Sequence, residues 1–388
     1  MPKSKERTVF EAPVATRSSI NRLRAGLRSS LTSWLQRLWY DSSPALNQRK
    51  LFRALSLSSR LYGHMQERSS RRAKLHQNRL PAYVISIGNL VAGGTGKTPF
   101  TIWLAAYLHS LGTRVAVLSR GYGGKNRAAS RVPENGDIFH LAAQFGDEPV
   151  LMARRLNGTS VWVGRKRWLS GLEALHSDKA ELLILDDGFQ HFSLKRDLDL
   201  VLLDSQSPFG NGSLLPLGPL REPINQLERA DAFILTRADD CEKSNETRLA
   251  VQRMFPDKPV FCCRHRLSGF RFGLSGANVP LKFIQNRRTV TFTGIARPDS
   301  FFASIAASGI TVAEHFAFPD HYFYAPHDLL RLLQSLNRSG ADLLITTEKD
   351  MVRLPAEFYS AVLTAQLELD FGPDRQRLCD FLDEQIGR

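Results

Sequence analysis

The residues best suited to chemistry lie in one glycine-rich turn, Gly93-Gly-Thr-Gly-Lys-Thr98. In such a turn the bare backbone N–H groups bind phosphate oxygens, the lysine places a positive charge on the β and γ oxygens, and the threonine hydroxyl ligates Mg²⁺. The turn departs from the general pattern G-x-x-x-x-G-K-[ST] at Val91, which stands in the place of the first glycine. We predict a nucleotide-phosphate site formed by Gly93, Gly94, Thr95, Gly96, Lys97 and Thr98.

The segments on either side of this turn are those that a phosphate-binding loop needs. The apolar run 83–87 suits a buried strand, and apolar side chains recur at helical spacing after Thr98. A second strand is expected over 114–119. Strand, turn, helix and strand in this order form a βαβ unit with a parallel sheet. A chance Gly-Lys-Thr in a flexible turn is therefore the weaker interpretation.

A second candidate site follows another apolar run, in Glu181-Leu-Leu-Ile-Leu-Asp-Asp-Gly-Phe-Gln-His191. The run predicts a buried strand that delivers Asp186 and Asp187 to the carboxyl edge of the sheet. Carboxylates at that position hold Mg²⁺ opposite a phosphate loop, the Walker-B arrangement. The alternative is that both acids lie in a surface turn.

Other polar clusters have an ordinary structural interpretation beside a functional one. Asp147 and Glu148 stand at a predicted helix start, where carboxylates commonly cap. His321 lies in an aromatic loop, where a single histidine is more often structural. Arg120 lies in a glycine-rich turn after a strand, and Arg165 follows the strand 160–164, so each cation either meets phosphate or only faces solvent.

The length and composition indicate two folded domains. A chain of 388 residues exceeds one ordinary core, and 43% hydrophobic with 23% charged residues is typical of a globular protein. Its four cysteines show neither C-x-x-C spacing nor a disulfide framework, which favours reduced thiols in the cytosol.

The net charge of +14 is concentrated at one end of the chain. Residues 1–80 hold 17 Lys and Arg against 4 Asp and Glu, whereas the rest hold 35 against 34. A nearly neutral body argues against nucleic acid as a partner, and a basic segment beside it favours an anionic membrane surface. We predict a disordered basic tail over 1–18 and amphipathic, membrane-associating helices over 19–80.

The first of these helices is expected over 20–40, because apolar residues recur there at steps of three and four between arginines. The alternative is a helix that packs on the protein's own core. A second helix is expected over 51–62, followed by a basic run at 68–79. There is no apolar signal-peptide region, and no window is long enough to span a bilayer.

The remaining chain predicts an α/β fold like that of P-loop nucleotidases, with a mostly parallel sheet flanked by helices and a smaller C-terminal α/β domain. We place the larger domain over 81–267, with its last strand near 259–263, and the smaller domain over 268–388. The smaller domain is predicted to hold strands at 289–292, 311–316 and 341–346, and helices at 298–307, 326–336 and 375–386.

Seven motifs together resemble one family. Gly-Gly-Thr-Gly-Lys-Thr-Pro, Arg-Gly-Tyr-Gly-Gly, Gly-Asp-Glu-Pro, Asp-Asp-Gly-Phe-Gln-His, Gly-Pro-Leu-Arg-Glu-Pro, Phe-Pro-Asp-His-Tyr and Thr-Glu-Lys-Asp follow one another as in the tetraacyldisaccharide 4′-kinases of lipid A biosynthesis. The resemblance covers roughly 35–388, and Val91 is usual for that family. It implies ATP-dependent phosphorylation of the 4′-hydroxyl of tetraacyldisaccharide 1-phosphate, giving lipid IV-A at the cytoplasmic face of the bacterial inner membrane, where the enzyme would be peripheral.

The resemblance also implies roles for individual residues. Asp147 matches the catalytic aspartate and would accept the hydroxyl proton, His321 would orient it, and Lys97 would stabilise the transferred phosphoryl group. Thr98 and Asp186 would hold Mg²⁺. Further metal or water ligands are expected at Asp187, Glu148 and Glu222. Contacts to phosphate or sugar are expected at Arg120, Arg165, Gln190, His191 and Arg221.

Two other functions fit parts of the sequence. Thr236-Arg-x-Asp239 faintly resembles a guanine-reading motif, so a P-loop GTPase or a metallochaperone-type nucleotide switch is the first alternative. The second is a nucleic-acid-binding ATPase, which the nearly neutral body disfavours.

Overall fold

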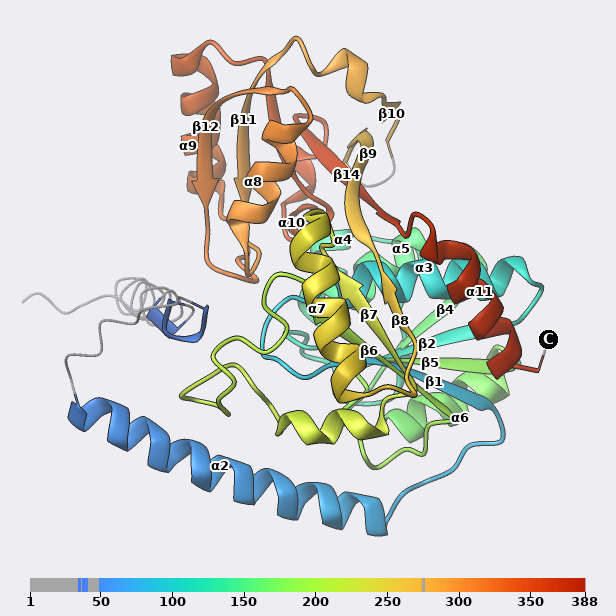
Figure 1. Ribbon diagram of the computed structural model, residues 1–388. Coiled ribbons are helices and arrows are strands. Elements are labelled where there is room, and N and C mark those ends of the chain that lie inside the picture. Colours follow the sequence, from blue (N-terminus) through green and yellow to red (C-terminus); the bar gives the residue numbers. More distant parts are fainter. Residues whose placement is uncertain (1–33, 36, 41–48, 274–275, 388) are drawn as a thin grey trace, which may run out of the picture.

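The structure is a computed structural model that describes residues 34–35, 37–40, 49–273 and 276–387. Within them the chain forms two α/β domains, each built on its own sheet (Figure 1). The predicted tail over 1–18 and most of the predicted helix over 20–40 lie outside these residues.

The larger sheet has eight strands in the order β3-β4-β2-β5-β1-β6-β7-β8. All neighbouring strands pair in parallel except β3 and β4, which are antiparallel. The strands are β1 (Tyr83–Asn89), β2 (Val115–Ser119), β3 (Ser130–Arg131), β4 (Ser160–Val163), β5 (Leu182–Asp186), β6 (Leu198–Asp204), β7 (Ala232–Thr236) and β8 (Val260–Cys262).

Alternate residues of the central strands enter cores on opposite faces of this sheet. Ile85 and Ile184 belong to the core that contains α3, whereas Val84 and Leu183 belong to the core that contains α6. Because both faces are covered, the central strands need apolar residues on both faces, and their sequences are mainly apolar. The helices of this domain are α3 (Lys97–Ser110), α4 (Ile138–Phe145), α5 (Asp147–Arg155), α6 (Arg167–Ser177) and α7 (Cys241–Met254).

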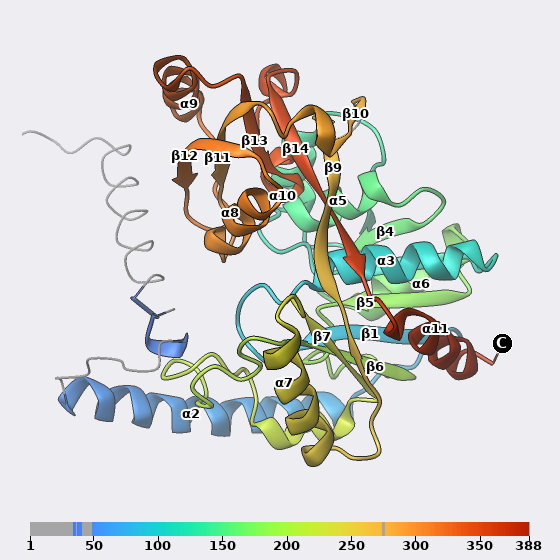
Figure 2. The same ribbon diagram turned by 45° about the horizontal axis from the view of Figure 1, so that its top comes forward.

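The second sheet has six strands in the order β10-β9-β14-β13-β11-β12. Its strands are β9 (Arg264–Phe272), β10 (Asn278–Val279), β11 (Arg288–Thr293), β12 (Thr311–Ala317), β13 (Leu343–Thr347) and β14 (Val362–Asp370). Its helices are α8 (Pro298–Ala307), α9 (Pro326–Ser339) and the short α10 (Glu348–Met351). Figure 2 shows β9 and β14 running side by side from this sheet to the edge of the larger domain.

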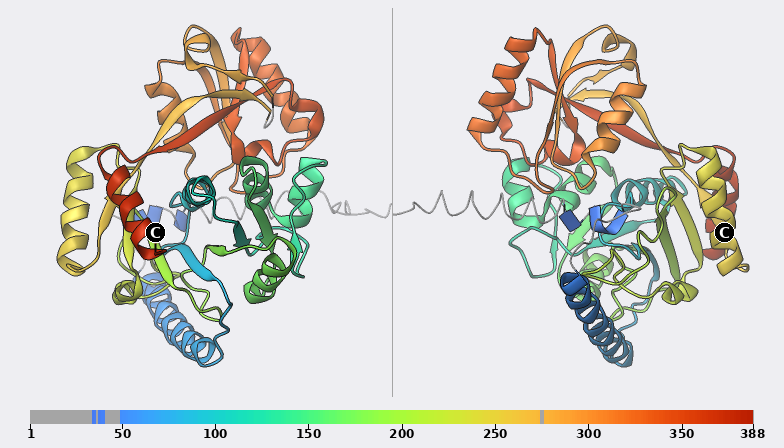
Figure 3. Two further views of the ribbon diagram at one scale, coloured as in Figure 1. Left: turned by 90° about the vertical axis from the view of Figure 1, so that its right-hand side faces the viewer. Right: turned by 60° about the vertical axis from the view of Figure 1, so that its left-hand side comes forward.

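The last helix, α11 (Asp374–Gln385), corrects the predicted domain organisation. Sequence analysis assigned it to the smaller domain, but it packs on the larger one beside α7 (Figure 3). The Tyr107 hydroxyl of α3 donates to Asp383 at 2.8 Å, and Phe261 of β8 packs against Phe381 with ring centroids 5.7 Å apart. The chain therefore crosses between the domains twice, through β9 and through β14.

The helix predicted over 51–62 is longer than expected. It is α2 (Arg49–Leu75), and it includes much of the basic run that was predicted to lead into the first strand. The helix lies along the larger domain, away from the second sheet (Figure 1). No helix in the described part of the chain is both long and apolar enough to cross a membrane.

Residues 34–40 are helical where they are described, and they pack on the larger domain. Leu38 is 4% exposed, and the Trp39 indole N–H donates to the Pro216 carbonyl at 3.0 Å. Trp34 remains exposed. This end of the predicted membrane helix therefore partly follows the alternative, a helix docked on the protein's own core.

Candidate active site

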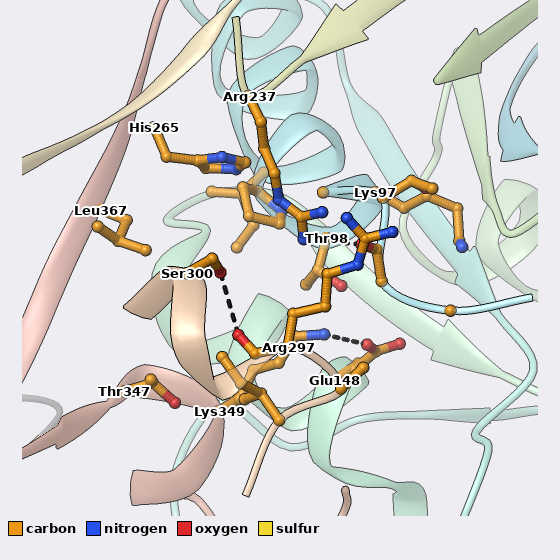
Figure 4. Close-up of a pocket in the computed structure, with 18 of the residues that line it drawn as sticks. Lys97, Thr98, Glu148, Arg237, His265, Arg297, Ser300, Thr347, Lys349 and Leu367 are labelled. Carbon is orange, nitrogen blue, oxygen red and sulfur yellow. Dashed lines mark hydrogen bonds and ion pairs between the residues drawn. The ribbon is translucent and has the colours of Figure 1, made fainter. Parts of the chain in front are cut away.

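A cleft of about 1820 Å³ is lined by both domains and by α2. Its first wall is the phosphate loop and the carboxyl ends of strands in the larger sheet, and its second wall comes from β9, α8 and α10. Figure 4 shows residues of both walls facing one another. The predicted residues that line it are Gly93, Gly94, Thr95, Gly96, Lys97, Thr98, Arg120, Glu148, Arg165, Asp186, Asp187, Gln190, His191, Arg221 and His321.

The phosphate loop is braced by the end of β7. Thr236 Oγ1 donates to the Thr95 carbonyl at 3.0 Å, and Arg237 donates to the Gly94 carbonyl at 2.9 Å. Gly96 caps α3 with φ at 82°, a left-handed conformation that favours glycine. The Thr236-Arg-x-Asp239 motif thus supports the loop through its first two residues, which is a structural use of a motif first considered for reading a base.

Lys97 and the two aspartates lie together at the adjacent ends of β1 and β5. Lys97 Nζ donates to Asn89 Oδ1 at 3.1 Å and lies 3.4 Å from Asp187 Oδ1. Asp186 is 3% exposed and accepts hydrogen bonds from Thr101 and Ser119. The parallel pairing of β1 with β5 produces this meeting, because it aligns the carboxyl ends of the two strands.

The charges at this edge favour a cation. Burial, together with the nearby carboxylates of Glu148 and Asp187, raises the pKa of Asp186 to about 6 against the opposing effect of Lys97. A divalent ion would relieve that repulsion. In the described chain no three His, Cys, Asp or Glu side chains form a complete metal site. Mg²⁺ is usually held by one or two carboxylates plus phosphate oxygens, so this donor set fits it.

Asp147 and His321 join the two domains by a hydrogen bond. His321 Nδ1 lies 2.8 Å from Asp147 Oδ2, and Arg353 Nε lies 3.6 Å from the same oxygen. Asp147 is 5% exposed; burial raises the pKa of Asp147, but the His321 hydrogen bond and the positive charges of His321, Arg353 and Lys349 lower it to about 2. The same bond raises the pKa of His321. His321 lines the cleft, whereas Asp147 lies behind it.

Glycine contacts fix the start of α5, where Asp147 stands. Gly146 has φ at 97°, and a Cβ there would lie 2.5 Å from the Tyr122 carbonyl oxygen. A Cβ on Gly124 would lie 2.6 Å from the Gly146 nitrogen. The Arg-Gly-Tyr-Gly-Gly turn therefore packs directly on the Gly-Asp-Glu-Pro turn, which explains Gly124 and Gly146 and positions Asp147.

The predicted substrate-contacting residues form a partly bonded network in the cleft. Arg221 donates to Asp187 at 3.0 Å and to Gln190 at 3.3 Å. Burial and neighbouring arginines lower the pKa of His191 to about 3, so its neutral ring accepts a hydrogen bond from Arg167. His191 therefore supports another side chain, and Arg120 and Arg165 line the cleft as cations.

Glu222 does not join the metal cluster, contrary to the sequence prediction. It is 2% exposed and accepts a hydrogen bond from Arg229 at 2.8 Å. The Arg229 guanidinium stacks 3.7 Å from the centre of the Phe189 ring. The Glu222 carboxylate is thus neutralised beneath the surface, and it is not among the lining residues.

Sequence analysis assigned no partners to several residues that shape the site. Arg167 is 4% exposed and donates to the Asp186 carbonyl at 3.3 Å, which holds the end of β5. Asp204, which is fully buried, pairs with Arg237 and with Arg297 of the second domain. A buried strand ending in an acid marked Asp204, but only the fold shows which arginines it meets.

Comparisons with known proteins identify the family of this chain. The family model described as tetraacyldisaccharide-1-P 4′-kinase matches residues 49–387. The chain belongs to the tetraacyldisaccharide 4′-kinase family. The kinase of that name from Syntrophobacter fumaroxidans is 50% identical over 355 residues, which are 92% of this chain and 93% of that protein. The one from Syntrophus aciditrophicus is 39% identical over 82% of this chain and 88% of its own length.

A solved structure of the family has the same fold. The crystal structure of LpxK from Aquifex aeolicus in complex with ATP superposes with a TM-score of 0.67 at 30% identity, covering 86% of this chain and 99% of that chain. The family match begins at the first residue of α2. In this 4′-kinase family member, α2 therefore belongs to the region that the family model covers, although it lies outside both sheets.

Proposed function

We propose that this protein transfers the γ-phosphoryl group of ATP to the 4′-hydroxyl of tetraacyldisaccharide 1-phosphate, with Asp147 and His321 as the proton-accepting pair. The family name and the ATP complex of the Aquifex aeolicus relative support the substrates. The observation that carries the mechanism is the meeting of the phosphate loop, the Asp186 edge and the Asp147–His321 pair at one cleft.

The larger domain would bind the nucleotide. The loop amides and Lys97 would stabilise the charge that develops on the transferred phosphoryl group. Thr98 and Asp186 would hold Mg²⁺, with Glu148 and Asp187 nearby, and the bound ion would neutralise phosphate charge. Asp187 and Glu148 are engaged by Lys97 and Lys349 in this structure, so nucleotide binding would exchange those partners.

The proton of the acceptor hydroxyl would enter the Asp147–His321 pair. The two groups share one hydrogen bond and titrate as a unit. Sequence analysis assigned proton acceptance to Asp147 and orientation to His321. The burial of Asp147 behind His321 favours uptake at the exposed imidazole, with Asp147 stabilising the imidazolium that results.

The direct test is transfer of labelled γ-phosphate from ATP to purified tetraacyldisaccharide 1-phosphate, with the deacylated disaccharide as a second acceptor. We expect transfer to the lipid with ATP, little competition by GTP, and loss of transfer in Asp147→Asn. If the wild-type protein produces no labelled lipid, the kinase assignment is rejected. Efficient competition by GTP would instead support the nucleotide-switch alternative.

We also propose that α2 docks the enzyme peripherally on the anionic cytoplasmic face of the inner membrane. Leu57, Leu61 and Met65 lie on one helical face and are 61%, 60% and 70% exposed. Arg68 and Arg72 extend the same face, and both are exposed. Apolar side chains flanked by arginines suit a headgroup layer.

The other face of α2 links this surface to the cleft. Tyr62 and Gln66 line the cleft, and the Tyr62 hydroxyl donates to the Arg221 carbonyl at 3.2 Å. A lipid acceptor would then reach the active site from the membrane plane without crossing water.

Vesicle binding tests the membrane proposal. Changing Leu57, Leu61 and Met65 together to Gln should weaken sedimentation with phosphatidylglycerol vesicles by at least about tenfold, since each buried apolar side chain contributes about 1.5–3 kcal/mol. Leu330→Gln is the matched control, because Leu330 is 58% exposed on α9. Equal sedimentation of the triple variant and the wild type would contradict docking through this face.

A further inference from the structure

Lys349 is a cation of the second domain whose role the proposed mechanism leaves open. It belongs to Thr347-Glu-Lys-Asp350 at the end of β13, and it lines the cleft opposite the phosphate loop. Its ammonium bonds to Glu148 of α5, across the boundary between the domains. Figure 4 shows this pair below Thr98.

The position of Glu148 brings Lys349 to the reacting groups. Glu148 is adjacent to Asp147 at the start of α5, and it lines the cleft together with Lys97 and Asp186. Lys349 lines the same cleft from the second domain and bonds to Glu148. Lys349 and Lys97 therefore enter one cleft from two domains, and the proposed Mg²⁺-binding edge lies in the same cleft.

The turn that carries Lys349 is firmly anchored. Asp350 is fully buried and accepts hydrogen bonds from Thr293 at 2.6 Å, from Tyr324 at 2.8 Å and from Arg353 at 2.9 Å. The Thr347 side chain caps the turn by accepting from the Asp350 N–H at 3.1 Å. The backbone at Lys349 is thus fixed, while its side chain remains 30% exposed to the cleft.

A purely structural ion pair would not need this arrangement, because a second pair already joins the same two helices. Arg155 of α5 bonds to Glu348 of α10, one residue before Lys349. Two pairs joining α5 to α10 provide a tether, and only one of them, Lys349 to Glu148, involves a carboxylate beside Asp147.

We propose that Lys349 is a catalytic residue that contacts the transferred phosphoryl group, supplied by the second domain. The proposal rests on the kinase function above. Without nucleotide the ammonium is bonded to Glu148. With nucleotide bound, the phosphoryl oxygens take its hydrogen bonds, and a lysine acts there as a mobile point charge. The two domains would then each supply one lysine to the same phosphoryl group.

The test compares Lys349→Met with Arg155→Gln, which breaks the neighbouring cross-domain pair. Wild-type transfer to the lipid acceptor is measured first, so that failure of the kinase assignment is recognised separately. We expect Lys349→Met to lower kcat by about 10²–10³-fold, as loss of one transition-state donor does. Arg155→Gln should stay within a few-fold of wild type, and Lys349→Arg should recover part of the rate.

Binding provides a readout independent of turnover. Lys349→Met should keep the affinity for ADP with Mg²⁺ within a few-fold but lose affinity for ADP with Mg²⁺ and aluminium fluoride, which mimics the transferred phosphoryl group. Ethylammonium should partly restore the rate of Lys349→Ala. Equal rate losses in Lys349→Met and Arg155→Gln would show that Lys349 only tethers the domains and would overturn the proposal. Equal losses of affinity for ADP with and without aluminium fluoride in Lys349→Met would overturn it too.

Discussion

Asp147→Asn tests the proton-accepting pair most directly, because it removes one negative charge and keeps the shape of the side chain. The pKa of Asp147 lies at about 2 against an ordinary 3.8, although burial alone would raise it. The bond from His321 and the nearby cations therefore favour the carboxylate by about 2 kcal/mol net. Because the coupling is mutual, the same bond holds the pKa of His321 above 6.5.

The expected result is a change in the pH dependence of kcat/KM. The wild-type value should rise with pH as His321 loses its proton, with a midpoint above 6.5, since only the neutral imidazole accepts a proton. In Asp147→Asn the imidazolium loses the hydrogen bond and the negative charge that raise its pKa, so the midpoint should fall to lower pH. The plateau should fall about 10²–10⁴-fold, the usual contribution of positioned acid–base catalysis.

The assay is the initial rate of labelled phosphate transfer at subsaturating acceptor across the neutral pH range. His321→Gln is the control and should remove the pH-dependent limb, while both variants should bind ATP within a few-fold of wild type. If Asp147→Asn leaves the midpoint where it is, His321 is not the group that titrates. A large loss of ATP affinity would instead give Asp147 a structural or metal-binding role.

Four further substitutions test the site and its framework. Gly146→Ala places a Cβ 2.5 Å from the Tyr122 carbonyl, so kcat should fall sharply while circular dichroism and ATP affinity stay near wild type. Asp204→Asn removes the negative charge that pairs with two arginines in a buried cluster. It should lower the free energy of unfolding, measured by urea denaturation, by about 3–5 kcal/mol. Asp370 pairs with Arg264, and the two side chains are 30% and 55% exposed, so Asp370→Asn should lower the free energy of unfolding by only about 0–1 kcal/mol. Equal losses of stability in Asp204→Asn and Asp370→Asn would contradict the argument from burial. Lys97→Met should lower kcat by about 10²–10³-fold, and an unchanged rate in single-turnover measurements would remove Lys97 from the chemistry.

The sequence predicted the α/β fold because the central strands are buried on both faces. The sequences of β1, β5 and β6 are mainly apolar, with Ser86 and Asp199 as the polar residues inside β1 and β6, and both β5 and β6 end in an acid. A strand of that kind can be recognised without knowing its neighbours. The same strands carry the phosphate loop and Asp186, so the core of the candidate site was predictable as well.

The strands β9 and β14 were missed for the opposite reason. β9 carries three arginines and a histidine, and its pattern of burial alternates weakly. In β14 the alternation of Leu363, Ala365, Leu367 and Leu369 was a usable signal that was not followed. Without these strands the sequence could not show that the chain returns to the larger domain, which misplaced α11.

Pairing between distant charges was also beyond the sequence. Glu222 lies in a distinctive motif beside Arg221, yet its carboxylate pairs with Arg229, seven residues away, while Arg221 turns to Asp187. Which arginine meets which acid depends on how the loop and the short helix Ile224–Arg229 pack on Phe189. Composition and spacing cannot decide between such partners.

Two pairs of charged side chains cross the boundary between the domains on the α5 side, beside an apolar core that contains residues of both domains. Glu148 with Lys349 and Arg155 with Glu348 join one side of the cleft, and each side chain is 16–30% exposed. Pairs of that exposure contribute little more than the 0–1 kcal/mol that is typical of surface pairs.

The other side of the cleft is held by a second buried acid. Asp204 is buried between Arg237 and Arg297, and the Arg297 guanidinium lies 4.7 Å from the centre of the Tyr40 ring. Separating the domains on that side would uncover the Asp204 carboxylate, and separating them at α5 would uncover Asp147, which is bonded to His321 of the second domain. Both sides of the boundary therefore resist opening through a buried carboxylate, and any separation at α10 would carry His321 and Lys349 away from the phosphate loop together.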